Sequence, residues 1–209
     1  MWAVVWRCVL NKRQMVALAA LPTLTLTMMP VYRLLARWLG RKRAWYAGFV
    51  VYWLIWCIPF SLWAIGPRKL RELLRFQRLQ KAEWFMLIIF PTLAFLGRYT
   101  LNKSPRSSRE KTLLVFVTIM NSFWEEVLWR GVYITLFPNS RWWAAVWPTM
   151  WFALWHYAPG SISPLADVRT LMIGAGVLGA SLSWLSLKTQ SIRTAALSHI
   201  LGGLAQVLS

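Results

Sequence analysis

Hydrophobic positions along this chain gather into long continuous stretches instead of alternating with polar ones. Stretches without a formal charge cover 14–32, 44–67, 142–166 and 170–187. Spanning a bilayer as a helix takes roughly 20 apolar residues, so each of these stretches is close to that length or above it. We therefore predict an all-α fold, a polytopic transmembrane helical bundle of about seven helices near 14–33, 44–66, 83–101, 112–137, 142–158, 167–187 and 193–208.

The segment between the second and third predicted helices, 66–79, follows another pattern. Leu70, Leu73, Leu74 and Phe76 can share one helical face, and basic residues occupy most of the remaining positions. This pattern is typical of an amphipathic helix that lies in the plane of the membrane interface. For the C-terminal half of the segment, a solvated basic loop is an equally good interpretation.

Composition agrees with a membrane protein. Hydrophobic residues make up 58% of the 209 residues and charged residues 14%, whereas soluble domains carry about 25% charged residues. The net charge of +18 would indicate nucleic acid in a soluble protein, but here the basic residues flank the apolar stretches. That placement predicts contact with anionic lipid headgroups and no nucleic-acid partner. The 16 tryptophans fit the same interpretation, because indole rings favour the headgroup region.

The N-terminus has basic residues before an apolar run, as a secretory signal does. The run is longer than the apolar region of a signal peptide and lacks a small-x-small cleavage site, so we interpret it as a retained first span. We expect a multi-pass protein of the cell membrane. Basic residues are divided almost evenly between the two sides of the predicted bundle, so its orientation stays open.

Three ionisable residues lie inside the fourth apolar stretch: Glu125, Glu126 and Arg130. Each costs about 2.5–3.5 kcal/mol at mid-membrane, which makes such a cluster a candidate functional site. Glu126 and Arg130 are four residues apart on one helical face and can neutralise each other. Glu125 points about 100° away and shares its face with Asn121, so Glu125 is the candidate reagent.

The two histidines of the chain, His156 and His199, also lie in apolar stretches. A single histidine in a membrane helix is more often a contact between helices than a catalyst. Here both belong to the same C-terminal half as the acidic pair. Carboxylate and imidazole together can hold and deprotonate a water, which predicts a hydrolytic site. A transporter or proton relay is a weaker alternative, because no inverted repeat is evident.

Two short motifs join these residues. Glu125, Glu126 and Arg130 form an EExxxR pattern, and Phe152 and His156 form an FxxxH pattern. Either pattern alone is weak, because EExxxR occurs in many soluble helices. Both here lie inside apolar helices, in this order.

A third pattern runs from His199 to Gly203. With it, the three motifs resemble those of the CPBP family, the CAAX-protease and bacteriocin-processing membrane peptidases also called Abi proteins, in which the third motif is HxxxN. The resemblance covers about 112–208. It implies two parts: 1–111, with N-terminal transmembrane helices and the basic interfacial segment, and 112–209, a CPBP-like catalytic helical core.

The resemblance also implies a mechanism. Glu125 would activate the attacking water together with His156, His199 would help to stabilise the oxyanion, and Glu126 and Arg130 would shape the site. The implied substrate is a membrane-associated or lipidated protein or peptide. No metal or cofactor is expected, although two histidines and a carboxylate could in principle hold zinc, which stays a minority alternative.

Gly203 departs from the family pattern, because it stands where the family has asparagine. Loss of one established oxyanion donor costs about 10²–10³ in rate. Asn121 or Gln206 could supply an amide instead. The glycine also keeps open a second interpretation, a catalytically inactive family member that acts as a membrane immunity factor or scaffold.

Overall fold

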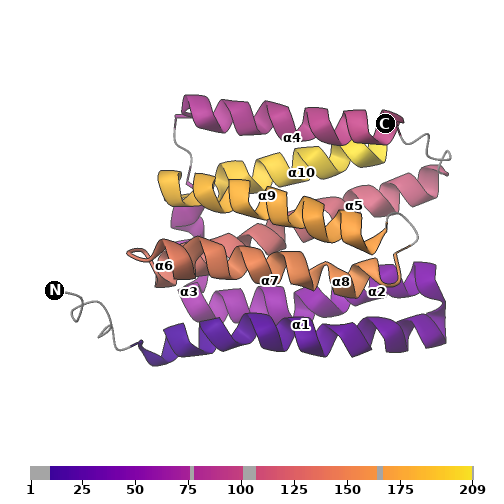
Figure 1. Cartoon of the computed structure of the whole chain (residues 1–209), viewed down its shortest axis with the longest axis horizontal. Helices are drawn as coiled ribbons and strands as arrows, with labels where there is room; N and C mark the ends of the chain where they lie inside the picture. The colour runs from indigo at the N-terminus through magenta and orange to yellow at the C-terminus, as the bar shows by residue number, and fades with distance from the viewer. Residues whose placement is uncertain (1–9, 76–77, 101–106, 164–166, 209) are drawn as a thin grey trace.

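The computed structural model describes residues 10–75, 78–100, 107–163 and 167–208. Within these ranges every regular element is a helix, and the elements join into seven helical rods that run side by side (Figure 1), as the sequence predicts. In chain order the rods are α1 (Lys12–Leu39); α2 (Arg41–Tyr52), the π-helical turn η1 (Trp53–Cys57) and α3 (Ile58–Leu73); α4 (Lys81–Thr100); α5 (Ser108–Glu126), η2 (Val127–Gly131) and α6 (Val132–Leu136); η3 (Trp142–Val146), α7 (Trp147–Trp155) and α8 (Tyr157–Gly160); α9 (Val168–Thr189); and α10 (Arg193–Leu208).

Three helices in the described part of the chain are long and apolar enough to cross a membrane: α1, the continuous helix from Arg41 to Leu73, and α9. They support a multi-pass membrane protein. Of the other rods, α10 has 16 residues, about 24 Å at 1.5 Å per residue, and α5 carries ionisable residues. The four remaining spans that the sequence predicts stay predictions.

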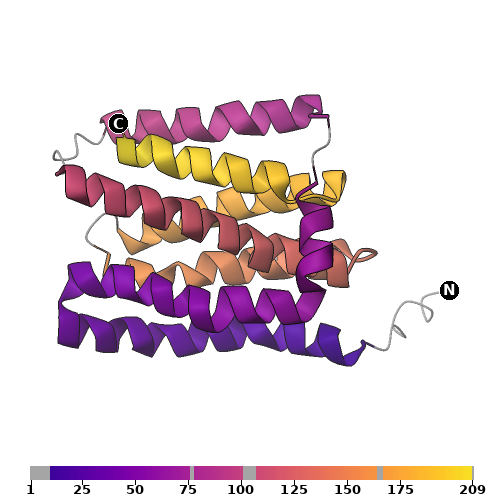
Figure 2. The same ribbon diagram turned by 180° about the vertical axis from the view of Figure 1, so that it is seen from behind.

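The helix that ends at Leu73 bends sharply near its end. Gly66 has φ +72° and ψ 163°, a conformation that is strained for any residue with a Cβ, and Pro67 follows it. The final turns therefore run across the ends of the neighbouring rods, as the upright purple segment in Figure 2 shows. The predicted amphipathic helix exists as far as Leu73, and residues 78–80 have no regular structure. Phe76 lies outside the described residues.

The apolar face of this short segment is covered by protein. Leu73 is buried in a small cluster with Val127, Ile134 and Ile192. Its carbonyl oxygen also accepts hydrogen bonds from Ser191 Oγ at 2.7 Å and from the Ile192 backbone N–H at 3.2 Å. The segment therefore docks onto the loop that leads into α10.

Helix packing brings the C-terminal helix onto the acidic one. α10 packs against both α4 and α5, whereas α9 packs mainly against α7 and α1 against α2. Buried Glu83 joins α4 to α10: its Oε1 accepts a hydrogen bond from Thr194 Oγ1 at 2.5 Å, and its Oε2 accepts one from the Gln80 backbone N–H at 2.9 Å. Arg193 Nη2 lies 4.0 Å from the same carboxylate. α10 is thus fixed at its first turn.

Candidate active site

The two adjacent glutamates stand at the end of α5, where the helix widens into the π-helical turn η2. Both are fully buried, as is Arg130. Arg130 Nη1 donates to Glu126 Oε1 at 2.9 Å, which is the ion pair that the four-residue spacing predicts. The guanidinium also lies over the Phe152 ring, 4.3 Å from its centroid. A buried charge is costly unless it is paired, and here each charge has the other as its partner.

His199 of α10 stands between the two glutamates. Its Nδ1 lies 2.8 Å from Glu126 Oε1, and its Nε2 lies 4.0 Å from Glu125 Oε2. Because Glu126 is paired with Arg130 as a carboxylate, it can only accept, so Nδ1 carries the proton in this hydrogen bond. His199 Nε2 is therefore the nitrogen that faces Glu125.

The two oxygens of Glu125 have different surroundings. Oε1 accepts a hydrogen bond from Trp155 Nε1 at 3.1 Å. Oε2 accepts none from the part of the chain that the structure describes, and it faces His199. One oxygen is thus held by an indole N–H, whereas the other is buried and receives no hydrogen bond from the described residues.

His156 stands at the C-terminal end of α7, with its ring edge-on to Phe152 at 4.6 Å between centroids. Its Nδ1 lies 2.7 Å from the Phe152 carbonyl oxygen, which can only accept, so Nδ1 donates and a neutral ring presents Nε2 as an acceptor. No hydrogen bond between His156 and Glu125 is present among the described residues. The Glu125 carboxylate instead lies 3.1 Å from Trp155 Nε1 and 4.0 Å from His199 Nε2.

The motif residues from three separate rods therefore meet around one phenylalanine. Phe152 contacts Arg130 and His156, and its ring centroid lies 6.4 Å from that of His199. Residues 108–204 match the family model described as Type II CAAX prenyl endopeptidase Rce1-like. This part of the chain is an Rce1-like domain of the CPBP (Abi) family. The resemblance that the motifs indicate is confirmed. No curated protein and no solved structure matches the chain.

Gly203 of the Rce1-like domain has a packing role. A Cβ at this position would lie 2.4 Å from Thr118 Cγ2, closer than any real contact between carbon atoms. Thr118 on α5 therefore fills the space next to the backbone of α10, and the Ser122 hydroxyl oxygen lies 3.9 Å from the same point. The glycine allows the two helices to approach closely at a position where the family motif has asparagine.

The two candidate replacements for that asparagine differ in their position. Asn121 Oδ1 accepts a hydrogen bond from Trp53 Nε1 at 3.0 Å, and Asn121 shares a face of α5 with Glu125. Gln206 is exposed near the end of α10. Of the two side chains, Asn121 is the one beside the glutamate.

Trp155 and Trp53 belong to the surroundings of the site, and the motifs do not identify them. The sequence offers only a general indication of their role. A buried indole N–H usually finds an acceptor, and Trp155 directly precedes a motif histidine. Acceptors for an indole cannot be chosen from sequence, because that choice depends on which helices pack together.

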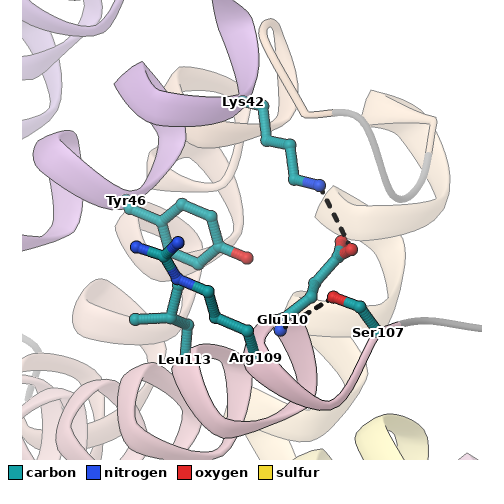
Figure 3. Close-up of a pocket in the computed structure, with 6 residues that line it drawn as sticks. All are labelled: Lys42, Tyr46, Ser107, Arg109, Glu110 and Leu113. Atoms are coloured by element: carbon teal, nitrogen blue, oxygen red, sulfur yellow. Dashed lines mark hydrogen bonds and ion pairs between the residues drawn. The ribbon is translucent and has the colours of Figure 1, made fainter.

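No group of three or more histidine, cysteine, aspartate or glutamate side chains in the described ranges is placed to share a metal ion. A surface pocket lies at the start of α5, where Lys42 pairs with Glu110 at 3.1 Å and Ser107 caps the helix (Figure 3). Glu110 and Glu125 are fifteen residues apart on one helix, about 22 Å, so this pocket is separate from the glutamate site.

Proposed function

We propose that this chain is an intramembrane endopeptidase that hydrolyses a peptide bond in a membrane-associated or lipidated protein or peptide. Membership of the Rce1-like family suggests a CAAX-type protease that acts on a protein substrate. One observation carries the proposal: buried Glu125 has one oxygen held by Trp155 and the other facing His199 Nε2 at 4.0 Å. A water at Glu125 Oε2 would stand within reach of both a base and an imidazole.

The proposed reaction assigns a role to each of these groups. Glu125 Oε2 takes a proton from the water while the water oxygen bonds to the carbonyl carbon of the substrate. His156 orients this water through its acceptor Nε2. The carbonyl oxygen becomes an oxyanion, and the C–N bond then breaks as the proton on Glu125 passes to the leaving nitrogen. The products are a carboxyl group and an amine.

Charge balance supports His199 as the oxyanion donor. The buried site holds two glutamates, Glu125 and Glu126, and a single guanidinium, Arg130, which pairs with Glu126. A protonated imidazole between them brings the sum of charges to zero, which lowers the cost of burying the group. In that state His199 Nδ1–H donates to Glu126 and Nε2–H is directed to the reacting centre. Such a donor stabilises charge that develops only in the transition state.

A comparison of membrane peptidomes tests the proposal. Cells that carry the wild type should release peptides that are absent with Glu125→Gln and with His156→Ala, while both variants reach the membrane in normal amounts. Glu72→Gln is the matched control, because its side chain is half exposed and its partners among the described residues are the surface bases Arg68 and Lys69. Unchanged release by Glu125→Gln would overturn the assignment.

The inactive alternative has Gly203 in its favour, because the family amide is absent from that position. A membrane immunity factor or scaffold would keep its cellular phenotype with Glu125→Gln and lose it only when the protein is removed. The same set of strains therefore separates the two functions.

A further inference from the structure

The surroundings of Glu125 include two consecutive aromatic residues from the N-terminal half, Tyr52 and Trp53. Both lie outside 108–204, the part that matches the Rce1-like family. Tyr52 ends α2 and Trp53 begins the π-helical turn η1. Both side chains are buried. π-helical turns within α-helices are frequent at functional sites, and this one stands beside the glutamates.

Trp53 acts on Asn121. Its indole Nε1 donates to Asn121 Oδ1 at 3.0 Å, which fixes the amide with its oxygen toward Trp53 and its Nδ2 away from it. Asn121 lies one turn before Glu125 on the same face of α5, so its amide stands next to the Glu125 side chain. Without the indole N–H, the amide could rotate and turn its oxygen toward the carboxylate.

Tyr52 acts on Trp155. The two rings stack with centroids 4.2 Å apart and planes 29° apart, and Tyr52 is itself held by a hydrogen bond from Trp129 Nε1 to its hydroxyl at 2.7 Å. The stacked indole of Trp155 donates to Glu125 Oε1. The orientation of that donor, and with it the rotation of the carboxylate, depends on the tyrosine ring.

Tyr32 of α1 also packs against the same indole. Its ring centroid lies 6.0 Å from that of Trp155, and it packs directly on Gly48 of α2, where a Cβ would collide with the ring. Trp155 is thus enclosed by aromatic residues from two N-terminal helices, and small displacements of either helix reach the Glu125 carboxylate through it.

We propose that Tyr52 and Trp53 of the second rod are positioning residues for Glu125, acting through Trp155 and Asn121 respectively. They set which oxygen of the carboxylate faces His199. The role in catalysis rests on the proposed peptidase function, whereas the positioning itself does not. The N-terminal half of the chain is then part of the active site and not only its membrane anchor.

NMR spectra of the tryptophan indole N–H groups in the detergent-solubilised protein test, without any substrate, whether these residues position Glu125. The Trp155 Nε1–H resonance, assigned with Trp155→Phe, should move in Trp53→Phe, because the altered amide changes the carboxylate that accepts from Trp155. It should stay in place in Trp63→Phe, a control in the same helical segment whose side chain is nearly half exposed. An unmoved Trp155 resonance in Trp53→Phe would overturn the proposal.

Kinetics test the catalytic consequence on a peptide whose release requires Glu125. Trp53→Phe should lower kcat about three- to tenfold, the range for one lost hydrogen bond, with KM little changed. In a double-mutant cycle, Trp53→Phe should add nothing further in an Asn121→Ala background. Fully additive losses would show that Trp53 acts independently of Asn121 and would contradict the proposed route. If no release depends on Glu125, the peptidase proposal fails, and the spectra still decide the positioning.

Discussion

Thr118 of α5 occupies the space that any side chain at position 203 of α10 would need, since its Cγ2 stands 2.4 Å from the position of a Cβ there. The replacement of the family's asparagine by Gly203 therefore depends on Thr118 as well. A methyl group on one helix and a missing side chain on the other let the helices that carry Glu125 and His199 approach closely.

Gly203→Asn should therefore destabilise the protein by about 1–3 kcal/mol, the usual cost of overpacking. Thr118→Ser removes the colliding methyl group, so the double variant should recover most of the lost thermal stability. Gly202→Ala serves as the control, because its Cβ would meet only ordinary contacts with Phe90 at 3.8 Å. Thermal unfolding in detergent measures all three. If the recovered double variant also cleaves faster than wild type, the restored amide contributes to the reaction.

Trp155→Phe should slow cleavage while the fold is kept. The substitution removes the donor to Glu125 Oε1 and retains a ring that can stack on Tyr52. Loss of one hydrogen bond to a charged group predicts a fall in kcat of about tenfold or more. Trp147→Phe on the same helix is the matched control, since its indole N–H donates to no group in the described residues. Equal effects of the two substitutions would contradict the assigned role of Trp155.

Arg130→Met should cost about 3–5 kcal/mol in the free energy of unfolding, because it leaves Glu126 buried without its guanidinium. The double variant Glu126→Gln/Arg130→Met removes both charges and should be clearly more stable than Arg130→Met alone. Chemical denaturation of the wild type, Arg130→Met, Glu126→Gln and the double variant measures this coupling. Additive losses would mean that the pair contributes no mutual stabilisation.

Glu83→Ala should loosen α4 from α10 by removing the acceptor for Thr194 Oγ1. The unpaired hydroxyl and the lost hydrogen bonds predict a loss of about 1–3 kcal/mol. Hydrogen exchange should rise first in the N-terminal turns of α4. Thr194→Ser keeps the hydroxyl and should keep the protection, whereas Thr194→Val should lose it. Equal exchange in the serine and valine variants would rule out this hydrogen bond as the main contact.

The helical rods and the ion pair could be predicted because both are encoded locally. Apolar stretches of sufficient length specify helices, and residues four apart share a helical face, which places Arg130 against Glu126. The contacts of Trp155 with Glu125 and of Trp53 with Asn121 join separate helices. In a membrane protein most helix faces are apolar, so hydrophobic pattern does not specify which faces meet.

The burial of Glu83 is a second feature that the sequence does not predict. It stands two residues after Lys81, at the start of an apolar stretch, where an acidic residue is expected at a solvated helix end. The structure buries it because the first turn of α10 packs against it. Burial at a helix end depends on the neighbouring helix, which the sequence of α4 alone does not contain.

The docking of Leu73 onto Ser191 and Ile192 has a consequence for the depth of the reaction in the membrane. His199 follows Ile192 by seven residues, about 10.5 Å along α10. A helix is stiff along its axis, so the position of the His199 imidazole along α10 is fixed relative to the anchored first turn. The short helical segment after Gly66 anchors that turn. In the proposed peptidase it would set how far a scissile bond must enter the bilayer before it meets Glu125.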